Sequence, residues 1–179
     1  MSEDNEAELV GQLKQGSTMA YQKILEIHLP SISRYVVRMT GNPSDAEDIT
    51  QDVFIRLWQK SSQFNPAAAR LTTWLHKIAH NLCIDHFRKL KSDTREYQDE
   101  SIDATDPVQQ LVDLRATASI TAAMLGLPER QRSAIVMCHY RGLSNKEAAV
   151  ILDISIDALE SLLSRGRNKL RHLLNGATS

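Results

Sequence analysis

Glycine, proline and aromatic residues are all scarce in this chain. Its 179 residues include only 7 Gly and 5 Pro, and aromatic side chains make up 5% of the total. There is no run of alternating β-branched residues, so neither a turn-rich sandwich nor an aromatic-rich sheet is expected. Apolar residues nevertheless make up 42% of the chain. We therefore expect an all-α protein whose helices pack through Leu, Ile, Val and Ala.

The chain also lacks the features of secreted, membrane-spanning and strongly basic proteins. Two cysteines, Cys83 and Cys138, do not suggest a disulfide framework, which favours a reducing compartment. The acidic N-terminus has no signal-peptide core, and no apolar run is long enough to cross a bilayer. The formal net charge is −1, so any nucleic-acid binding must come from local clusters of positive charge. These observations predict a cytoplasmic protein without direct membrane insertion.

The most informative pattern lies between residues 144 and 171. Ser144 and Glu147 fit the S-x-x-E capping box that starts a helix. Residues 153–155 interrupt the apolar spacing, and a longer helical pattern follows. Its far end carries the basic residues Arg165, Arg167, Lys169 and Arg171. This order is typical of a helix-turn-helix, which places its second helix in the major groove. An ordinary helical hairpin with a solvated charged face is the alternative.

Helical spacing elsewhere predicts helices at 4–15, 18–39, 44–60, 72–90, 108–124 and 129–140. Pro30 should bend the second of these or mark a local irregularity, and Ser44 with Glu47 should cap the third through another capping box. Residues 92–106 are polar and acidic, so this stretch cannot bury enough apolar surface to fold alone. The sequence thus predicts two small helical domains, at 1–91 and 114–179, joined by a flexible acidic linker at 92–113.

Four segments together resemble one protein family. They are DAEDITQDVFIRLW (45–58), TTWLHKIAHNLCIDHFRK (72–89), LPERQRSAIVMCHYRGLSNKEAA (127–149) and SIDALESLLSRGRNKL (155–170). Their order resembles the extracytoplasmic-function (ECF) group of bacterial RNA polymerase sigma factors, the minimal two-domain type. The resemblance implies sigma domain 2 followed by sigma domain 4. It also implies a protein that binds core RNA polymerase, directs it to promoters and helps to open the duplex, without being an enzyme and without a cofactor.

In this family the third helix docks on a coiled coil of the polymerase's largest subunit. The positions that match here are Asp48, Gln51, Asp52, Phe54, Ile55 and Trp58. An exposed acidic and aromatic face suits a partner surface with arginine and apolar side chains. Core packing is the alternative for Trp58.

The fourth helix and the loop before it resemble the part of the family that reads the −10 element. An opened strand needs basic residues for its phosphates and a pocket for an unstacked base. The loop at 62–71 is expected to form the wall of that pocket, and Trp74 is expected in the core. The residues expected to contact −10 DNA are His80, Asn81, Arg88, Lys89 and Lys91.

The second domain is expected to grip the −35 element. The implied contacts are Ser155, Ser161, Arg165 and Lys169. Ser155 can also cap the recognition helix, and Arg165 could pair with a guanine edge or a phosphate. Asp153 stands where many relatives have glycine, and Asp can adopt the left-handed conformation of such a turn. Glu160 and Leu162 stand where relatives often have basic residues, so the family's promoter preference cannot be transferred to this chain.

Members of this group are commonly held inactive by an anti-sigma factor, and a flexible acidic linker would permit the rearrangement that this needs. In the family the linker also threads toward the RNA-exit path of the polymerase, whereas a plain solvated tether is the alternative.

Three other functions remain open at this point. The chain could be a helix-turn-helix regulator that acts without polymerase, or a decoy that binds an inhibitor and no longer initiates transcription. It could also be a metal sensor, because His76, His80 and Cys83 fall near one face of a helix, with His86 further along it. Cys138 and His139 add another pair of possible ligands.

Overall fold

The structure is a computed structural model that describes residues 3–96, 120–139 and 143–176. Every regular element within these ranges is helical, which confirms the all-α prediction. The helices are α1 (Glu3–Lys14), α2 (Thr18–Thr40), α3 (Pro43–Lys60), the short 3-10 helix η1 (Ser61–Gln63), α4 (Leu71–Glu96), α6 (Glu129–Cys138), α7 (Asn145–Leu152) and α8 (Ile156–Gly176). Residues 120–125 are also helical, while the rest of the helix expected at 108–124 and most of the expected linker lie outside the described residues.

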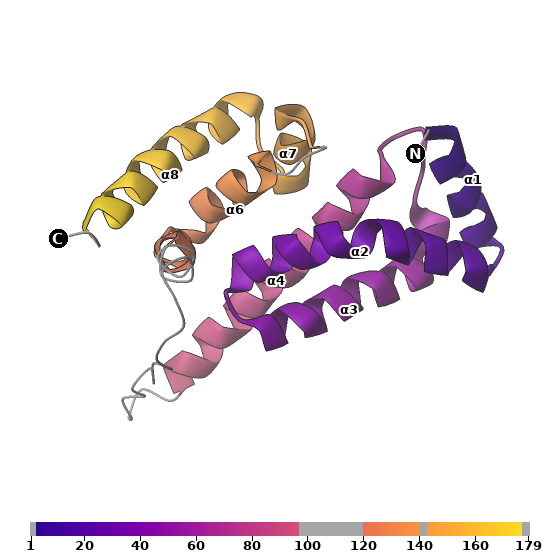
Figure 1. The fold of residues 1–179 in the computed structure, drawn as a ribbon, viewed down its shortest axis with the longest axis horizontal. Helices are drawn as coiled ribbons and strands as arrows, with labels where there is room; N and C mark the ends of the chain where they lie inside the picture. Colours follow the sequence, from indigo (N-terminus) through magenta and orange to yellow (C-terminus); the bar gives the residue numbers. More distant parts are fainter. Residues whose placement is uncertain (1–2, 97–119, 140–142, 177–179) are drawn as a thin grey trace, which may run out of the picture.

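Helices α2, α3 and α4 run alongside one another, and α1 packs against α2 at one end of this bundle (Figure 1). The side chains that they bury almost completely include Ile24, Ile32, Tyr35, Val36, Met39, Val53, Leu57, Leu71, Leu75, Ala79 and Cys83. Each large aliphatic side chain buried in this way contributes about 1.5–3 kcal/mol. The aliphatic core predicted from the composition therefore holds the first half of the protein together.

The start of α3 differs from the sequence prediction. Asn42, not Ser44, is the N-cap, and its Oδ1 accepts hydrogen bonds from the backbone N–H groups of Ser44 (2.9 Å) and Asp45 (3.4 Å). The helix begins earlier because Pro43 has a φ that suits the first helical position and has no N–H group to satisfy. The prediction of a capping box at Ser44 was therefore wrong.

Helix α2 (Thr18–Thr40) agrees with the helix predicted at 18–39; it continues through Pro30 and is capped by Gly41, which has a φ of 70°. Helix α4 extends to Glu96, beyond the end predicted at residue 90. Once a helix is formed, each added residue gains a hydrogen bond without a new nucleation cost, so a polar sequence can prolong it.

The second half contains the helix-turn-helix. The Ser144 hydroxyl accepts from the Glu147 N–H while the Glu147 carboxylate accepts from the Ser144 N–H, which confirms the predicted capping box. Asp153 has φ 54° and ψ 50°, the left-handed conformation predicted for the turn. Ser155 Oγ accepts from the N–H of Ala158 at 3.1 Å and caps α8. Helix α6 packs against both α7 and α8 behind this motif.

The two halves pack against each other in the described part of the chain. Helix α6 contacts α2 and α7 contacts α4, and buried side chains of both halves form one hydrophobic cluster. Gly41 permits a close approach, because a Cβ at this position would lie 2.5 Å from Leu125 Cδ1. The described helices include none that is long and apolar enough to cross a membrane.

Candidate nucleic-acid and partner interfaces

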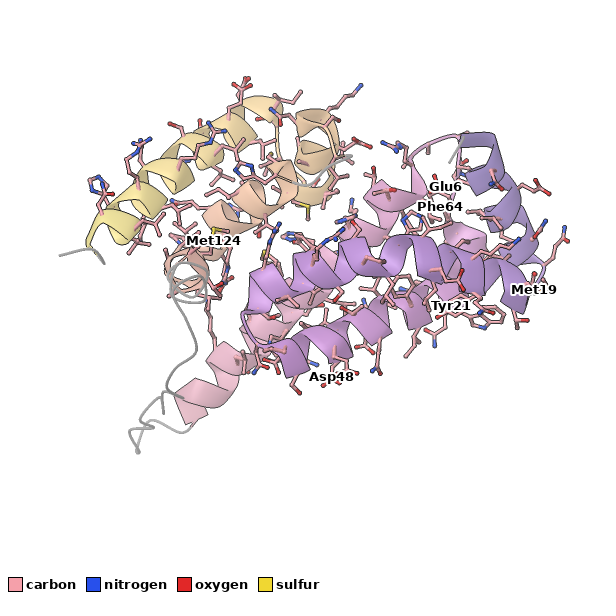
Figure 2. All side chains as sticks on the ribbon, viewed as in Figure 1. Glu6, Met19, Tyr21, Asp48, Phe64 and Met124 are labelled. Carbon is pink, nitrogen blue, oxygen red and sulfur yellow. The ribbon has the colours of Figure 1, made fainter. Side chains whose placement is uncertain are left out.

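The outer face of α3 changes from acidic to apolar along its length. Asp48, Gln51 and Asp52 are exposed in its first half, and Figure 2 shows Asp48 directed away from the bundle. Ile55 and Trp58 follow with 49% and 41% of their surface exposed. The Trp58 ring packs edge-on against Tyr21, with centroids 5.4 Å apart. Trp58 is therefore held in place and yet available to a partner, which argues against the core alternative.

Phe54 does not belong to this face. Its side chain is only 3% exposed and lies in the core, where the Tyr21 hydroxyl donates to the Phe54 carbonyl at 3.2 Å. Phe54 comes one turn after the buried Thr50 and one turn before the buried Leu57, so the helical period turns it toward α2. The expectation that its ring lies on the docking surface is thus corrected.

A groove that the sequence reasoning missed lies between α2 and α3, beside the acidic-apolar face. It has a volume of about 730 Å³ and is lined by Tyr21, Leu25, Leu29, Ser33, Val37, Pro43, Ala46, Glu47, Thr50, Gln51, Phe54 and Ile55. Leu29 and Val37 are 37% and 39% exposed, and they follow Leu25 at helical spacing along the outer side of α2. The continued apolar spacing of α2 on its outer side was the only signal for it.

The loop before α4 encloses a second hollow, with a volume of about 380 Å³, together with α1. Glu6, Ala7 and Val10 form the α1 side, and the chain from Phe64 to Leu71 forms the other; Glu6 and Phe64 lie near each other in Figure 2. The imidazole of His28, whose Nε2 lies 3.1 Å from Glu6 Oε1, lowers the pKa of Glu6 against the opposing effect of burial. The loop expected to form a base-pocket wall therefore lines a hollow together with α1, which sequence reasoning had not assigned.

Trp74 packs behind this hollow. Its ring lies 5.3 Å from that of Phe64 and contacts the main core, in agreement with the expected core role. Lys14 Nζ donates to the Phe64 carbonyl at 2.7 Å and fixes the start of the loop.

The five residues expected to contact −10 DNA fall into two groups. Asn81, Arg88 and Lys89 are exposed on α4. His80 is half-buried with its Nδ1 3.1 Å from the Tyr35 hydroxyl, and Lys91 Nζ lies 2.5 Å from the Glu129 carboxylate of α6. Burial lowers the pKa of His80 to about 4, so its imidazole is neutral near pH 7.

His80 faces the second half of the protein rather than solvent. It lines a hollow of about 340 Å³ between the halves, together with Ile84, Glu129, Arg130, Ser133, Leu152, Ile154 and Leu162. The expected DNA contact at His80 therefore requires that the halves move apart. Leu162 packs against the hydrophobic core, as its apolar character suggested.

The histidines considered as metal ligands each have a separate partner. His76 Nδ1 lies 2.8 Å from the Thr72 carbonyl and is 1% exposed, and His86 Nε2 lies 3.3 Å from Asp45. Burial raises the pKa of the Cys83 thiol to about 12, which disfavours the thiolate that a metal requires. In the ranges that the structure describes, no three His, Cys, Asp or Glu side chains gather as a metal site.

The outer face of α8 carries the residues expected at the −35 element. Ser161, Arg165 and Lys169 are all exposed, and Arg165 Nε donates to the Ser161 carbonyl at 3.2 Å. Glu160 is exposed as well, so a negative charge accompanies these donors. The helix thus offers the Arg165 guanidinium, held at the Ser161 carbonyl, and the further exposed cations Arg167, Lys169 and Arg171.

Comparison with known proteins agrees with this arrangement. Residues 24–92 match the family model Sigma-70 region 2, and residues 117–170 match Sigma-70, region 4. The chain is 32% identical over 179 residues to the ECF RNA polymerase sigma factor SigW of Bacillus subtilis, covering 92% of this chain and 94% of SigW. It is 30% identical over 165 residues to SigE of Mycolicibacterium smegmatis, covering 89% of this chain and 63% of SigE.

A solved structure shows the same fold. It is a co-crystal structure of the sigma factor RpoE with the anti-sigma factor NepR from Bartonella quintana, with a TM-score of 0.72 and 28% identity over 87% of this chain and 96% of RpoE. On these matches and the helix-turn-helix described above, the chain belongs to the ECF RNA polymerase sigma factors.

Proposed function

We propose that this chain is a promoter-specificity subunit of RNA polymerase, which reads the −10 element with its first half and the −35 element with its helix-turn-helix. The observation that carries the proposal is the exposed acidic-apolar face of α3. A regulator that acts alone on duplex DNA has no need of such a face, whereas a polymerase subunit must dock. In this role the protein positions DNA and polymerase and performs no catalytic step of its own.

The docking surface comprises Asp48, Gln51, Asp52, Ile55 and Trp58. The exposed carboxylates suit a basic partner, and Ile55 and Trp58 provide the apolar anchor that dominates most interfaces. A coiled coil of the polymerase's largest subunit fits this combination. The neighbouring groove between α2 and α3 extends the available apolar area.

The DNA contacts follow from charge and exposure. Asn81, Arg88 and Lys89 are available on α4 for the opened −10 strand, as is the exposed Lys91 beside Glu129, and His80 joins them when the halves separate. In the −35 duplex, Arg165 is placed for a guanine edge or a phosphate, beside Ser155, Ser161 and Lys169. Because Glu160 weakens the positive field of α8, binding should depend on both elements and on polymerase together.

We also propose control by an anti-sigma factor. RpoE, which shares the fold and 28% identity, was solved in complex with such a partner. The inhibitor would compete for surfaces that polymerase and DNA need.

In vitro transcription tests the main proposal. Core polymerase with this protein, given fragmented genomic DNA, should produce transcripts with discrete starts that core enzyme alone does not produce. Trp58→Ala on α3 should abolish most of this transcription. Ile27→Ala removes a similarly exposed side chain (43%) from α2 and should leave transcription unchanged. Duplex binding without any transcript would indicate a free-standing regulator, and polymerase binding without DNA selection would indicate a decoy.

A further inference from the structure

The carboxylate of Glu147 joins the two halves of the protein. Its Oε2 accepts from the backbone N–H (2.7 Å) and hydroxyl (2.9 Å) of Ser144 and so completes the cap of α7. Its Oε1 accepts from the Thr73 hydroxyl at 2.9 Å and lies 3.6 Å from Arg70 Nη1. Burial alone would raise the pKa of Glu147, but hydrogen bonds from Ser144 and Thr73 with the charge of Arg70 keep it below its usual value. The group that reaches the first half is therefore an anion.

Arg70 and Thr73 stand at a place where DNA is expected. Arg70 ends the loop that lines the hollow against α1, and Thr73 lies in the first turn of α4, the helix assigned to the −10 element. A guanidinium, a hydroxyl and the first turn of a helix all favour a bound anion. The same groups hold the phosphates of nucleic acids.

A second carboxylate repeats this arrangement further along α4. Glu129 of α6 pairs with Lys91, which is itself one of the expected phosphate contacts. The second half thus places one carboxylate on a cation at the start of α4 and another on a cation near its end. Arg70 directly precedes α4 and Lys91 lies in its later turns, so negative charge of the second half meets positive charge at both places.

We propose that Arg70 and Thr73 bind a backbone phosphate of the opened −10 strand, and that Glu147 occupies this phosphate site while the two halves are closed. The inference rests on the proposed function, because it assumes that α4 meets single-stranded DNA. The Thr73 hydroxyl has a single hydrogen, which it donates to Glu147 in the closed form, so its use by a phosphate requires the release of α7. The apparent affinity of the protein for DNA is then the affinity of the open form multiplied by the fraction of molecules that are open.

The test measures binding of a fluorescein-labelled oligo-dT strand to the full chain by anisotropy at fixed salt. Glu147→Gln removes the charge but keeps a capping box, because glutamine serves at this position as well. We expect it to bind the strand about tenfold more tightly than the native chain, the effect of losing one charge-assisted contact that holds the closed form. Glu26→Gln, which removes an exposed carboxylate from α2, is the matched control for net charge and should change affinity less than about twofold.

A double-mutant cycle with Arg70→Ala decides whether the two residues compete at one site. In the Glu147→Gln background the site is open, so removing Arg70 should weaken binding several-fold and reduce the slope of log K against log salt by about 0.7. In the native background the same change should have a smaller effect, because Arg70 there is held by Glu147. Equal effects of Arg70→Ala in both backgrounds, or no gain from Glu147→Gln, would overturn the inference.

The cycle at Lys91 and Glu129 provides an independent check. Glu129→Gln should tighten strand binding. Lys91→Ala should weaken binding more in the Glu129→Gln background than in the native chain, and equal effects in the two backgrounds also count against the inference. If Glu147→Gln does not fold, as judged by circular dichroism, this cycle decides alone. If neither cycle shows these effects while the native protein still directs promoter-specific transcription, the phosphate site is refuted and the proposed function stands.

Discussion

The neutral imidazole of His80 should make this protein sensitive to mild acid. His80 lies between the halves, with its Nδ1 3.1 Å from the Tyr35 hydroxyl, and burial lowers its pKa from 6.5 to about 4. Above pH 6.5 the imidazole is neutral in both the folded and the unfolded chain. Between these two pKa values the unfolded chain binds a proton and the folded chain does not, so the free energy of unfolding falls as the pH falls.

The size of the effect follows from the two pKa values. Lowering the pH from about 7 to about 5 should remove about 2 kcal/mol of stability through His80 alone. Below the folded pKa both states are protonated and no further loss arises from this residue. Burial also lowers the pKa of His76, so His76 destabilises the protein in acid as well. Because His76 is present in every variant compared, its effect cancels in the comparison.

Urea unfolding, followed by circular dichroism, measures the free energy of unfolding at each pH. The native chain should lose about 2 kcal/mol more between pH 7 and pH 5 than His80→Asn, which cannot take up the proton. His172→Asn changes an exposed histidine on α8 and is the matched control, expected to follow the native chain. Equal losses in the native chain and in His80→Asn would refute the reasoning, because the imidazole would then not be buried in its neutral form.

Three further predictions concern other parts of the molecule. Trp58→Ala should weaken binding to core polymerase by about 2 kcal/mol, or roughly thirtyfold, measured by biolayer interferometry, since a half-exposed anchored tryptophan is a typical interface hot spot. Arg165→Ala should lower −35 affinity about tenfold in footprinting at fixed salt, and Glu160→Lys should raise affinity but loosen specificity. Asp153→Val should destabilise the protein by about 1–2 kcal/mol in thermal unfolding, because a β-branched residue strains the left-handed turn, whereas Asp153→Gly should not.

Local signals in the sequence predicted the helix-turn-helix well. The capping box at Ser144 and the left-handed Asp153 depend on residues close in the chain, so short-range hydrogen bonding and steric rules were enough. Family resemblance supplied the function, because four motifs in order identify it where one motif would not. The start of α3 was misread because two capping residues, Asn42 and Ser44, lie close together and the effect of Pro43 was not weighed.

Placement of site residues was less predictable. Phe54 and Trp58 are both aromatic residues of α3, yet one is buried and the other is exposed. The helical period places Phe54 on the same face as the buried Thr50 and Leu57, but the apolar stripe of a helix is wide enough to include Trp58 as well, so the packing of α2 decides how far burial extends. The contribution of Glu6 to the hollow beside the −10 loop was likewise invisible, because α1 is far from that loop in sequence.

The sequence by itself determined that this protein is helical, that it contains a helix-turn-helix and that it is a sigma factor, because helical periodicity, caps and motif order are all local features of the sequence. The tertiary structure decided which of the expected contacts are accessible. It placed His80 against the second half, left Lys91 exposed beside Glu129, and brought Glu147 to Arg70 and Thr73, residues more than seventy positions away. Such pairings depend on how two amphipathic halves bury their remaining apolar surface against each other, and no local pattern encodes that choice.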